Sequence, residues 1–501
     1  MTLAFPEIIH RVQQALPVGY PVYLVGGAVR DALLQREVKD LDFVLSRDVL
    51  SIARRLANAL GAAYYPLDEE RDTARLILVA PSGERQVLDF AGLRGPDLES
   101  DLRLRDFTIN ALAISLDDLD HLIDPLGGMG DLRLGRLRAC SETAMSDDAL
   151  RILRGVRLAN ANGWLILPET RRLMRQALPM LTQVSPERLR DELFRMLDGP
   201  KPATAIDALE ILGGLPYVLP ELSGLKGVTQ PAPHVADVWR HTLDVLRNLE
   251  NLLNTLGLHH DPEAATSFSL GMVSVRLGRY RQQFHDYLDQ PLNLNRSLRS
   301  VLFLAALYHD VGKPETRQEA ADGKIRFLEH EKIGEALVGK RGMALRLNNE
   351  EIDWLKRVIR HHMRPLLLSQ MDQLPTRRAI YRFFRDNGSG TLPRSGTNSG
   401  VAICLHALAD TLATYGPTLT EDKWIHQLDV TRSLLEAWWE RPDESVSPPR
   451  LVDGHDLMQS LSLKPGPEIG RLLEELREAQ AAGVVLTRQQ ALDYARQQLK
   501  A

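Results

Sequence analysis

Cysteine, aromatic residues and long apolar runs are all scarce in this chain of 501 residues. Its two cysteines, Cys140 and Cys404, have no metal-site spacing, which argues against a disulfide scaffold and a cysteine zinc site. Aromatic residues make up 6% of the sequence, so an RNA-recognition sheet built on aromatic stacking is not expected. No apolar run approaches the ~18 residues of a membrane span, and residues 1–10 lack the basic start of an export signal. We therefore expect a cytoplasmic protein without a membrane segment.

The remaining composition is that of an ordinary globular protein, with 44% hydrophobic residues, 25% charged residues and a net charge of −5. The length suggests about two to four domains. The mildly negative total argues against nucleic acid covering the whole surface, but it leaves room for a local basic groove.

Apolar periodicity indicates strands only near the N-terminus, and helical patterns dominate after about Leu132. The fold expected is therefore α+β, with a small sheet-and-helix head followed by a mostly α-helical remainder. Prolines and turn residues divide the chain into residues 1–139, 140–230, 231–440 and 451–501, with a linker over Arg441–Arg450. The predicted elements of the head are strands over Val22–Val25 and Leu41–Leu45, a helix over Ala28–Leu34, and a hairpin of Leu76–Ala80 and Gln86–Phe90 around Pro81-Ser82-Gly83.

A glycine turn and two aspartates form the first group of candidate functional residues. Gly26-Gly27 lies at a helix start, where backbone N–H groups can approach a phosphate, and Arg30 follows one turn later. Asp40 and Asp42 are two apart on a strand, so both face one side and suit a hard cation such as Mg²⁺. Asp89 could add a third carboxylate. Either motif alone is common in turns and solvated strand edges, but together they predict phosphoryl-transfer chemistry.

A second group suits the choice of a nucleotide. Arg105 and Asn110 follow the predicted sheet, and Asp148, Arg151 and Arg154 recur at a spacing close to one helical face. An Asp–Arg pair offers an acceptor beside several donors, which matches the amino group and ring nitrogen shared by cytosine and adenine. The plain alternative, an amphipathic helix with salt bridges, becomes less favourable once the metal motif is present.

These residues resemble the bacterial class II tRNA nucleotidyltransferase and poly(A) polymerase family from Val22 to about Gly214, including Asp124-Pro125-Leu126-Gly127-Gly128, which looks like the family's hinge. The resemblance implies a nucleotidyltransferase head over residues 1–139 and a nucleotide-selecting, RNA-binding region over 140–230. It implies Mg²⁺ as cofactor and tRNA, CTP and ATP as partners. By the same resemblance, Asp40 and Asp42 hold the metal, Gly27 and Arg30 contact the triphosphate, and the nucleotide pocket is formed by Arg105, Asp148, Arg151, Arg154 and Arg157.

The chain departs from that family's pattern in a way that bears on the product. Only Phe90 to Ser100 separate Asp89 from Asp101, whereas relatives that add the full CCA triplet tend to carry a longer loop here. Addition of CCA, of CC and of A alone therefore stay open. Poly(A) polymerase activity is a further alternative, and so is an RNA-binding protein with a decayed catalytic site.

Histidines and aspartates form a third group within residues 231–440. An apolar helix over Leu302–Leu307 is followed by His309-Asp310. The other candidate ligands are His241, His330, Asp410 and one histidine of the doublet His361-His362, for which we take His361. This ligand set suits a divalent transition metal, although histidines satisfied within a helical core are the plain alternative. The order resembles the HD-domain metal phosphohydrolases, which implies hydrolysis of phosphomonoesters or cyclic phosphates.

The last segment, 451–501, carries Gly454-His455-Asp456-Leu457 and Pro465-Gly466-Pro467. It resembles the C-terminal part of the same nucleotidyltransferase family, which implies a helical tail that helps to hold tRNA. A plain turn would also explain Pro-Gly-Pro.

Overall fold

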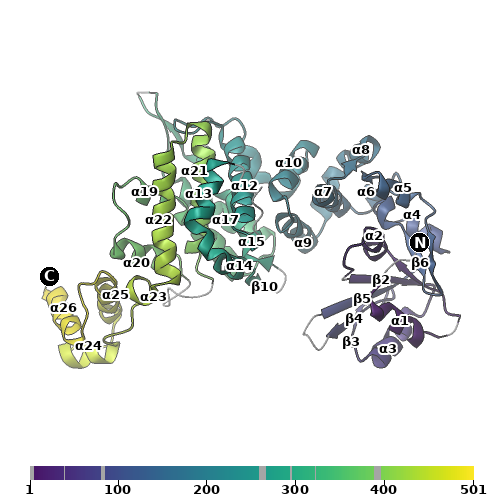
Figure 1. Ribbon diagram of the computed structural model, residues 1–501, viewed down its shortest axis with the longest axis horizontal. Helices are drawn as coiled ribbons and strands as arrows, with labels where there is room; N and C mark the ends of the chain where they lie inside the picture. The colour runs from purple at the N-terminus through teal and green to yellow at the C-terminus, as the bar shows by residue number, and fades with distance from the viewer. Residues whose placement is uncertain are drawn as a thin grey trace. The chain divides into compact units, whose positions relative to one another are not determined.

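The computed structural model of the protein describes residues 5–17, 19–38, 40–79, 85–258, 267–293, 296–321, 323–388 and 397–500. It confirms the α+β prediction, since the large sheet is confined to the N-terminal part and the rest is almost entirely helical (Figure 1). The chain forms two compact units, Met1–Val184 with Ile211–Tyr217, and Ser185–Glu210 with Val218–Ala501. Among the described helices, none combines the length and the apolar character needed to cross a bilayer.

The first unit is built on a seven-stranded sheet of order β3-β4-β5-β2-β1-β6-β7. Strand β1 lies antiparallel to both β2 and β6, and β2 runs parallel to β5. The strands are β1 (Val22–Val25), β2 (Asp40–Leu45), β3 (Ala63–Asp68), β4 (Thr73–Val79), β5 (Arg85–Gly92), β6 (Ala113–Ser115) and β7 (Asp118–Ile123), with a separate pair β8 (Arg136–Leu137) and β9 (Leu165–Ile166).

Helices cover both faces of this sheet because the central strands β1 and β2 carry apolar residues on each side. Leu41, Phe43 and Leu45 of β2 pack with residues of α1, α2 and α3 on one face, and Val44 packs with Leu102 of α4 on the other. The helices of this unit are α1 (Glu7–Ala15), α2 (Gly27–Leu33), α3 (Val49–Leu60), α4 (Leu98–Arg103), α5 (Gly128–Arg133), α6 (Ala144–Asp147), α7 (Leu150–Asn162) and α8 (Pro168–Ala177), with 3-10 turns η1 (Thr108–Asn110) and η2 (Leu178–Gln183).

The second unit is helical, and its most buried helices are α15 and α21, whose sequences are apolar on nearly every face. Its described helices up to residue 445 are α9 (Pro186–Leu197), most of α10 (Pro202–Leu212), α12 (Val238–Thr255), α13 (Phe268–Leu277), α14 (Arg281–Leu288), α15 (Leu298–Tyr308), α16 (Lys313–Thr316), α17 (His330–Ala344), α18 (Asn349–His361), α19 (Arg364–Ser369), α20 (Arg377–Asp386), α21 (Gly400–Tyr415), α22 (Glu421–Trp439) and α23 (Pro442–Ser445). The short helix α11 (Leu215–Val218) lies mainly in the first unit. The short strands β10 (Pro291–Asn293), β11 (Arg296–Ser297), β12 (Arg317–Glu319) and β13 (Ile325–Phe327) form two small hairpins, and η3 (Pro220–Leu225), η5 (Gly278–Tyr280) and η6 (Gly416–Thr418) are 3-10 turns.

The tail has a small apolar core of its own, shared by α24 (Gly454–Leu461), α25 (Pro467–Ala481) and α26 (Arg488–Lys500). It is fastened to α20 by polar contacts, since Tyr381 donates to Glu474 at 3.1 Å and Arg382 forms an ion pair with Glu478 at 2.6 Å. The segment Arg441–Arg450, predicted as a linker, contains the short helix α23, and its role as a linker stays a prediction.

Candidate functional sites

The candidate Mg²⁺ site lies on one face of the head sheet. Asp40 and Asp42 alternate along β2 with the buried Leu41 and Phe43, so both carboxylates emerge on the same side. The parallel register of β2 and β5 pairs Asp42 with Asp89, which places the third carboxylate beside them. Asp89 already forms an ion pair with Arg75 at 2.7 Å. Asp40 and Asp42 are therefore the pair of carboxylates available to a metal ion, whereas the neighbouring Asp89 is already paired with Arg75.

Electrostatics favour a cation at this pair. The pKa of Asp42 is raised because surrounding protein atoms desolvate its carboxylate, although Arg105 opposes the shift, and Asp89 and Asp40 raise it further. The side chain still keeps solvent-accessible surface. A divalent cation would offset the repulsion between carboxylates that are crowded in this way.

The glycine turn before α2 leaves room for the site. Gly26 adopts φ +75°, a left-handed conformation that a side chain would strain. A Cβ at this position would lie 3.3 Å from an Arg105 guanidinium nitrogen and 3.5 Å from an Asp42 carboxylate oxygen. Gly27 begins the helix, so its backbone N–H is among those left free for an anion.

A continuous polar chain joins this turn to helix α7. Arg30 forms two hydrogen bonds with its neighbour Asp31, at 2.8 and 2.9 Å, and donates to Asn110 at 2.6 Å. Asn110 donates to Asp106 at 3.1 Å, and Asp106 forms an ion pair with Arg154 at 2.9 Å. Burial alone would raise the pKa of Asp106, but Arg154 and the hydrogen bonds from Asn110 and Phe107 hold it below its ordinary value. The predicted triphosphate and base residues are thus parts of one network.

Arg105 is fixed by an aspartate that the sequence did not single out as functional. Its guanidinium donates twice to Asp101, at 2.9 and 3.0 Å, and Asp101 is fully buried. Arg94, in the connection between β5 and α4, forms an ion pair with the other oxygen of Asp101 at 2.9 Å. Burial disfavours the charged carboxylate, but the two arginines hold the pKa of Asp101 below its ordinary value.

The predicted helical face of Asp148, Arg151 and Arg154 needs a correction. Helix α7 begins at Leu150, so Asp148 precedes it in extended conformation and its carboxylate accepts the Leu150 N–H at 3.2 Å. A short polar side chain before a helix competes for such free N–H groups, which is why the helix does not extend back to Asp148. The Arg151 guanidinium donates instead to the carbonyls of Leu104, Arg105 and Ala144. Arg154 and Arg157 lie one turn apart on α7.

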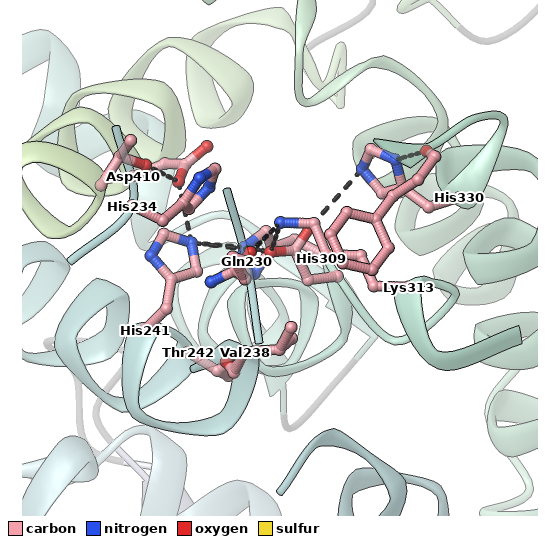
Figure 2. Close-up of polar contacts among 12 residues, drawn as sticks. Gln230, His234, Val238, His241, Thr242, His309, Lys313, His330 and Asp410 are labelled. Atoms are coloured by element: carbon pink, nitrogen blue, oxygen red, sulfur yellow. Dashed lines mark hydrogen bonds and ion pairs between the residues drawn. The ribbon is translucent and has the colours of Figure 1, made fainter. Parts of the chain in front are cut away.

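The histidines and aspartates of the second unit form two buried groups, each of which could hold a metal ion. The first group is His241, His309 and Asp410, and the second is Asp310, His330 and His362. In the first group, His241 Nε2 lies 3.1 Å from Asp410 Oδ1 and 3.3 Å from His309 Nε2. In the second, the Nε2 atoms of His330 and His362 lie 3.4 Å apart. Figure 2 shows His241 and Asp410 on one side of His309 and His330 on the other.

Asp310 stands between the two groups. Its Oδ2 lies 3.1 Å from His309 Nε2 and 3.6 Å from His241 Nε2, whereas its Oδ1 lies 3.4 Å from His330 Nε2 and 4.0 Å from His362 Nε2. One carboxylate that presents an oxygen to each of two ligand groups is the arrangement of a bridged pair of metal ions. Burial disfavours the charged form of Asp310, but His309 and Lys313 hold its pKa well below the ordinary value.

Backbone carbonyls orient three of these imidazoles. The Nδ1 atoms of His309, His330 and His362 lie 2.7–2.9 Å from the carbonyls of Ala306, Phe327 and Ile359, to which they can only donate. This places the proton on Nδ1 and leaves each Nε2 lone pair facing the group, as metal coordination requires. Convergent Nε2 atoms and carboxylates, buried together, fit divalent metal ions.

The choice of His361 is wrong. Helix α18 ends at His361, and successive helical residues point in different directions, so only one histidine of the doublet can face the other ligands. His362 is fully buried and lies in the group. His361 is half-buried near Arg364, and burial lowers its pKa to about 4.

Three further residues of this centre were missed. Lys313 forms an ion pair with Asp310 at 2.6 Å, one helical turn after the His-Asp doublet. The rings of His234 and His406 contact those of His241 and His309, at centroid distances of 5.2 and 4.9 Å. His406 precedes Asp410 by four residues, a helical spacing that could have indicated it.

A cavity of about 700 Å³ opens beside the second-unit centre. Asp310, His330 and Asp410 reach it from the metal groups, and Lys313 lies next to them. Its remaining wall combines apolar and aromatic residues, among them Pro231, Phe327 and Leu366, with polar side chains from α19, α21 and α22. A bound anion could therefore contact both the metal groups and an ammonium group.

Comparison with known proteins gives matches along most of the chain. The poly(A) polymerase head domain matches residues 22–138, and the probable RNA- and SrmB-binding site of polymerase A matches 165–225. The HD domain matches 238–383, and domain 2 of tRNA nucleotidyltransferases matches 448–495.

Relatives of known activity align over nearly their whole length. The A-adding tRNA nucleotidyltransferase of Deinococcus radiodurans is 34% identical, covering 93% of each chain. The CC-adding tRNA nucleotidyltransferase of Geobacter sulfurreducens is 32% identical, covering 95% of this chain and 91% of its own. The Thermotoga maritima CCA-adding enzyme, solved in complex with tRNA, shares the fold with a TM-score of 0.59 at 21% identity, covering 99% of this chain and 96% of its own.

Proposed function

The chain belongs to the tRNA nucleotidyltransferase and poly(A) polymerase family, and from this premise we propose that it adds two cytidylyl residues to the 3′ end of tRNA without a nucleic-acid template. The observation that carries the choice of CC is the short, fixed connection between β5 and α4. This connection contains only residues 93–97. We also expect the enzyme to work in the cytoplasm, since both cysteines are free thiols, as a reducing compartment would keep them.

Two contacts hold the connection against α4. Asp97 accepts the N–H of Ser100 at 2.8 Å and so caps the helix. Arg94 is bound to Asp101, which also holds Arg105 beside Gly26 and Asp42. The segment where CCA-adding relatives carry a longer loop is therefore tied to a residue of the nucleotide pocket.

A fixed pocket favours one size of base. Adding C, C and then A requires the same side chains to accept a pyrimidine and then a larger purine. Asp101 holds Arg105, and backbone carbonyls hold Arg151, so the pocket resists the change of shape that a purine would require. Addition of A alone is the second candidate, because a relative at 34% identity is an A-adding enzyme.

In the proposed reaction, the 3′-hydroxyl oxygen of tRNA forms a bond to the α-phosphorus of CTP, the bond to the leaving pyrophosphate breaks, and the hydroxyl proton passes to solvent. Asp40 and Asp42 would hold Mg²⁺, which when bound offsets charge on the triphosphate and on the attacking oxygen. The N–H groups at Gly27 and the guanidinium of Arg30 bind the triphosphate, and Arg105 orients the nucleotide. Asp148, Arg151, Arg154 and Arg157 surround the base and its phosphates.

The test uses tRNA ending at the base before CCA and tRNA ending in CC, each incubated with CTP, with ATP or with both, followed by sequencing of the 3′ ends. We expect two C residues on the first RNA and no addition to the second. Extension of the second RNA by A, complete CCA, or a long A tail on generic RNA would each replace the proposal with the corresponding activity. Asp40→Ala plus Asp42→Ala should abolish extension, whereas Asp117→Asn, in the exposed β6–β7 turn, should not.

A second activity, metal-dependent hydrolysis of phosphate esters, is favoured by Asp310, whose two oxygens face the two ligand groups. His241, His309 and Asp410 would hold one divalent transition-metal ion, and His330 and His362 the other. Bound ions would offset phosphate charge and make water a better nucleophile, and Lys313 would bind a phosphate oxygen. The bond from phosphorus to the ester oxygen breaks, the water oxygen takes its place, and the alcohol leaves with a proton.

His309→Ala should abolish the release of phosphate from a phosphomonoester in the presence of Mn²⁺, Ni²⁺ or Co²⁺. The control is His285→Ala, a half-exposed histidine on α14 outside the cluster. Equal phosphate release by wild type and His309→Ala would refute this second activity. CTP addition by both variants should remain that of wild type.

A further inference from the structure

Helix α8 of the first unit turns a row of arginines toward solvent. Its inner face, with Thr170, Leu173, Met174 and Ala177, is buried against the rest of the unit. Arg171, Arg172 and Arg175 lie on the outer part of the helix, where residues one turn apart are neighbours. The helix therefore separates an apolar face from a basic one.

These arginines line a surface groove of about 280 Å³, together with Pro168 and Gln176. Arg172 forms an ion pair with Glu169. Arg171 donates to the carbonyl of Ile166 at 3.2 Å, and in the described part of the chain neither it nor Arg175 has a carboxylate partner. Two guanidinium groups that share a groove without a counter-charge suit an anion, and guanidinium geometry matches phosphate oxygens.

The groove is rigidly connected to the nucleotide-selecting helix. Gly155 of α7 is packed so closely that a Cβ there would lie 2.3 Å from the end of Met174 and 2.7 Å from the ring of Phe107. Thr170 accepts the N–H of Ala139 at 2.9 Å, and Ala139 forms a β-bridge with Phe107. An anion bound to α8 would therefore keep a fixed position relative to Arg154 and Arg157 on α7.

We propose that the α8 groove binds a backbone phosphate of the RNA substrate and so sets the position of its 3′ end relative to the nucleotide pocket. The proposal rests on the proposed tRNA nucleotidyl transfer. The charge of the groove and its fixed connection to α7 favour an RNA phosphate. The match of residues 165–225 to an RNA-binding region agrees with this choice.

The experiment measures equilibrium binding of the full chain to tRNA lacking CCA at several KCl concentrations. Arg171→Gln plus Arg175→Gln should weaken binding and reduce the slope of log K against log[KCl] by about one for each arginine that contacts phosphate. Arg171→Lys plus Arg175→Lys keeps the charge and should retain the slope. Arg47→Gln removes an exposed arginine of the same unit that lies beside Asp48, and it should change neither quantity.

The thermal midpoint of the double Gln variant and its KM for CTP are measured in parallel, and both should equal those of wild type. An unchanged salt slope in the double Gln variant would overturn the inference. A raised KM for CTP with unchanged RNA binding would also overturn it, by assigning the groove to the nucleoside triphosphate. Failure of wild type to extend tRNA would refute the proposed function alone, because the binding measurement needs no turnover.

Discussion

Asp106→Asn tests whether the buried network of the head positions Arg154 for the nucleotide. One oxygen of Asp106 accepts the Phe107 N–H at 2.8 Å and an Asn110 N–H at 3.1 Å, while the other faces Arg154 Nε at 2.9 Å. In the Asn variant, the amide oxygen can keep the first two donors, but the amide nitrogen then faces Arg154, donor against donor. The contact to Arg154 is lost, and with it the negative charge that also acts on Arg151.

The size of the expected effect on KM follows from the lost contact between Asp106 and Arg154. A hydrogen bond to a charged partner contributes about 1.5–3 kcal/mol, which corresponds to roughly a 10- to 150-fold change in an equilibrium constant. We therefore expect Asp106→Asn to raise KM for CTP by roughly 10- to 100-fold, with a smaller effect on kcat. Steady-state extension of tRNA lacking CCA, with CTP varied, measures both constants.

A matched buried aspartate provides the control. Asp131 accepts hydrogen bonds from Thr108 Oγ1 at 2.6 Å and from Arg138 Nε at 2.8 Å, and within the described residues it forms no hydrogen bond or ion pair with α7. Asp131→Asn should leave KM for CTP unchanged. Combining Asp106→Asn with Arg154→Gln should raise KM little beyond the larger single effect, since both changes remove one interaction. An unchanged KM in Asp106→Asn, or full additivity in the double variant, would refute the reasoning.

Four further predictions follow from local geometry. Gly26→Ala and Gly61→Ala both place a side chain at positive φ, so each should lower the free energy of unfolding by about 1–2 kcal/mol. Only Gly26→Ala should also lose extension activity, because nothing lies within 4 Å of a Cβ at Gly61. His362→Ala should lose bound transition metal, measured by mass spectrometry after dialysis, whereas His361→Ala should keep it; the opposite result would restore the sequence-based choice. Glu351→Ala should lower the free energy of unfolding by about 3–5 kcal/mol in urea titrations followed by tryptophan fluorescence, since it removes the close ion pair of the buried Arg296 and leaves it with Asp191 at 3.7 Å. Arg296→Met in the same chain should recover part of the loss. Because the pKa of Asp106 is lowered in the folded state, its ionised carboxylate stabilises the fold at pH values above the ordinary carboxyl pKa of about 3.9. This stabilisation is lost as the pH falls through the lower folded pKa, so Asp106→Asn should flatten the acid side of the plot of unfolding free energy against pH.

Short-range patterns predicted the centre of the head correctly. Strand β1 has the predicted bounds, and β2, β4 and β5 differ from prediction by a few residues, while the turn Pro81-Ser82-Gly83 lies outside the described residues. Strands β3, β6 and β7 were not predicted. In β3 and β7, no residue is fully buried, so neither shows clear apolar alternation, and their pairing with β4 and β6 is set by partners that sequence periodicity does not reveal.

The site residues also divide into those that local sequence spacing predicts and those that depend on partners brought close by folding. The D-x-D strand, the glycine turn and the His-Asp doublet have local geometry that spacing alone determines. Asp101 and Lys313 were missed as functional because their roles depend on Arg105 and Asp310 after folding. The choice between His361 and His362 depended on where α18 ends, and helix ends are the least certain part of a sequence-based prediction.

The two ligand sets are different enough to hold different metals in one chain. Asp40 and Asp42 offer only oxygen, from one face of the central strand β2, which suits Mg²⁺ with several waters still attached. The second unit offers buried imidazoles whose Nδ1 protons are fixed by backbone carbonyls, which favours a transition metal and resists exchange. A chelator that is selective for transition metals should therefore abolish phosphate release while nucleotide addition continues in Mg²⁺. Parallel loss of both activities under that chelator would show that the two centres do not discriminate between metals in this way.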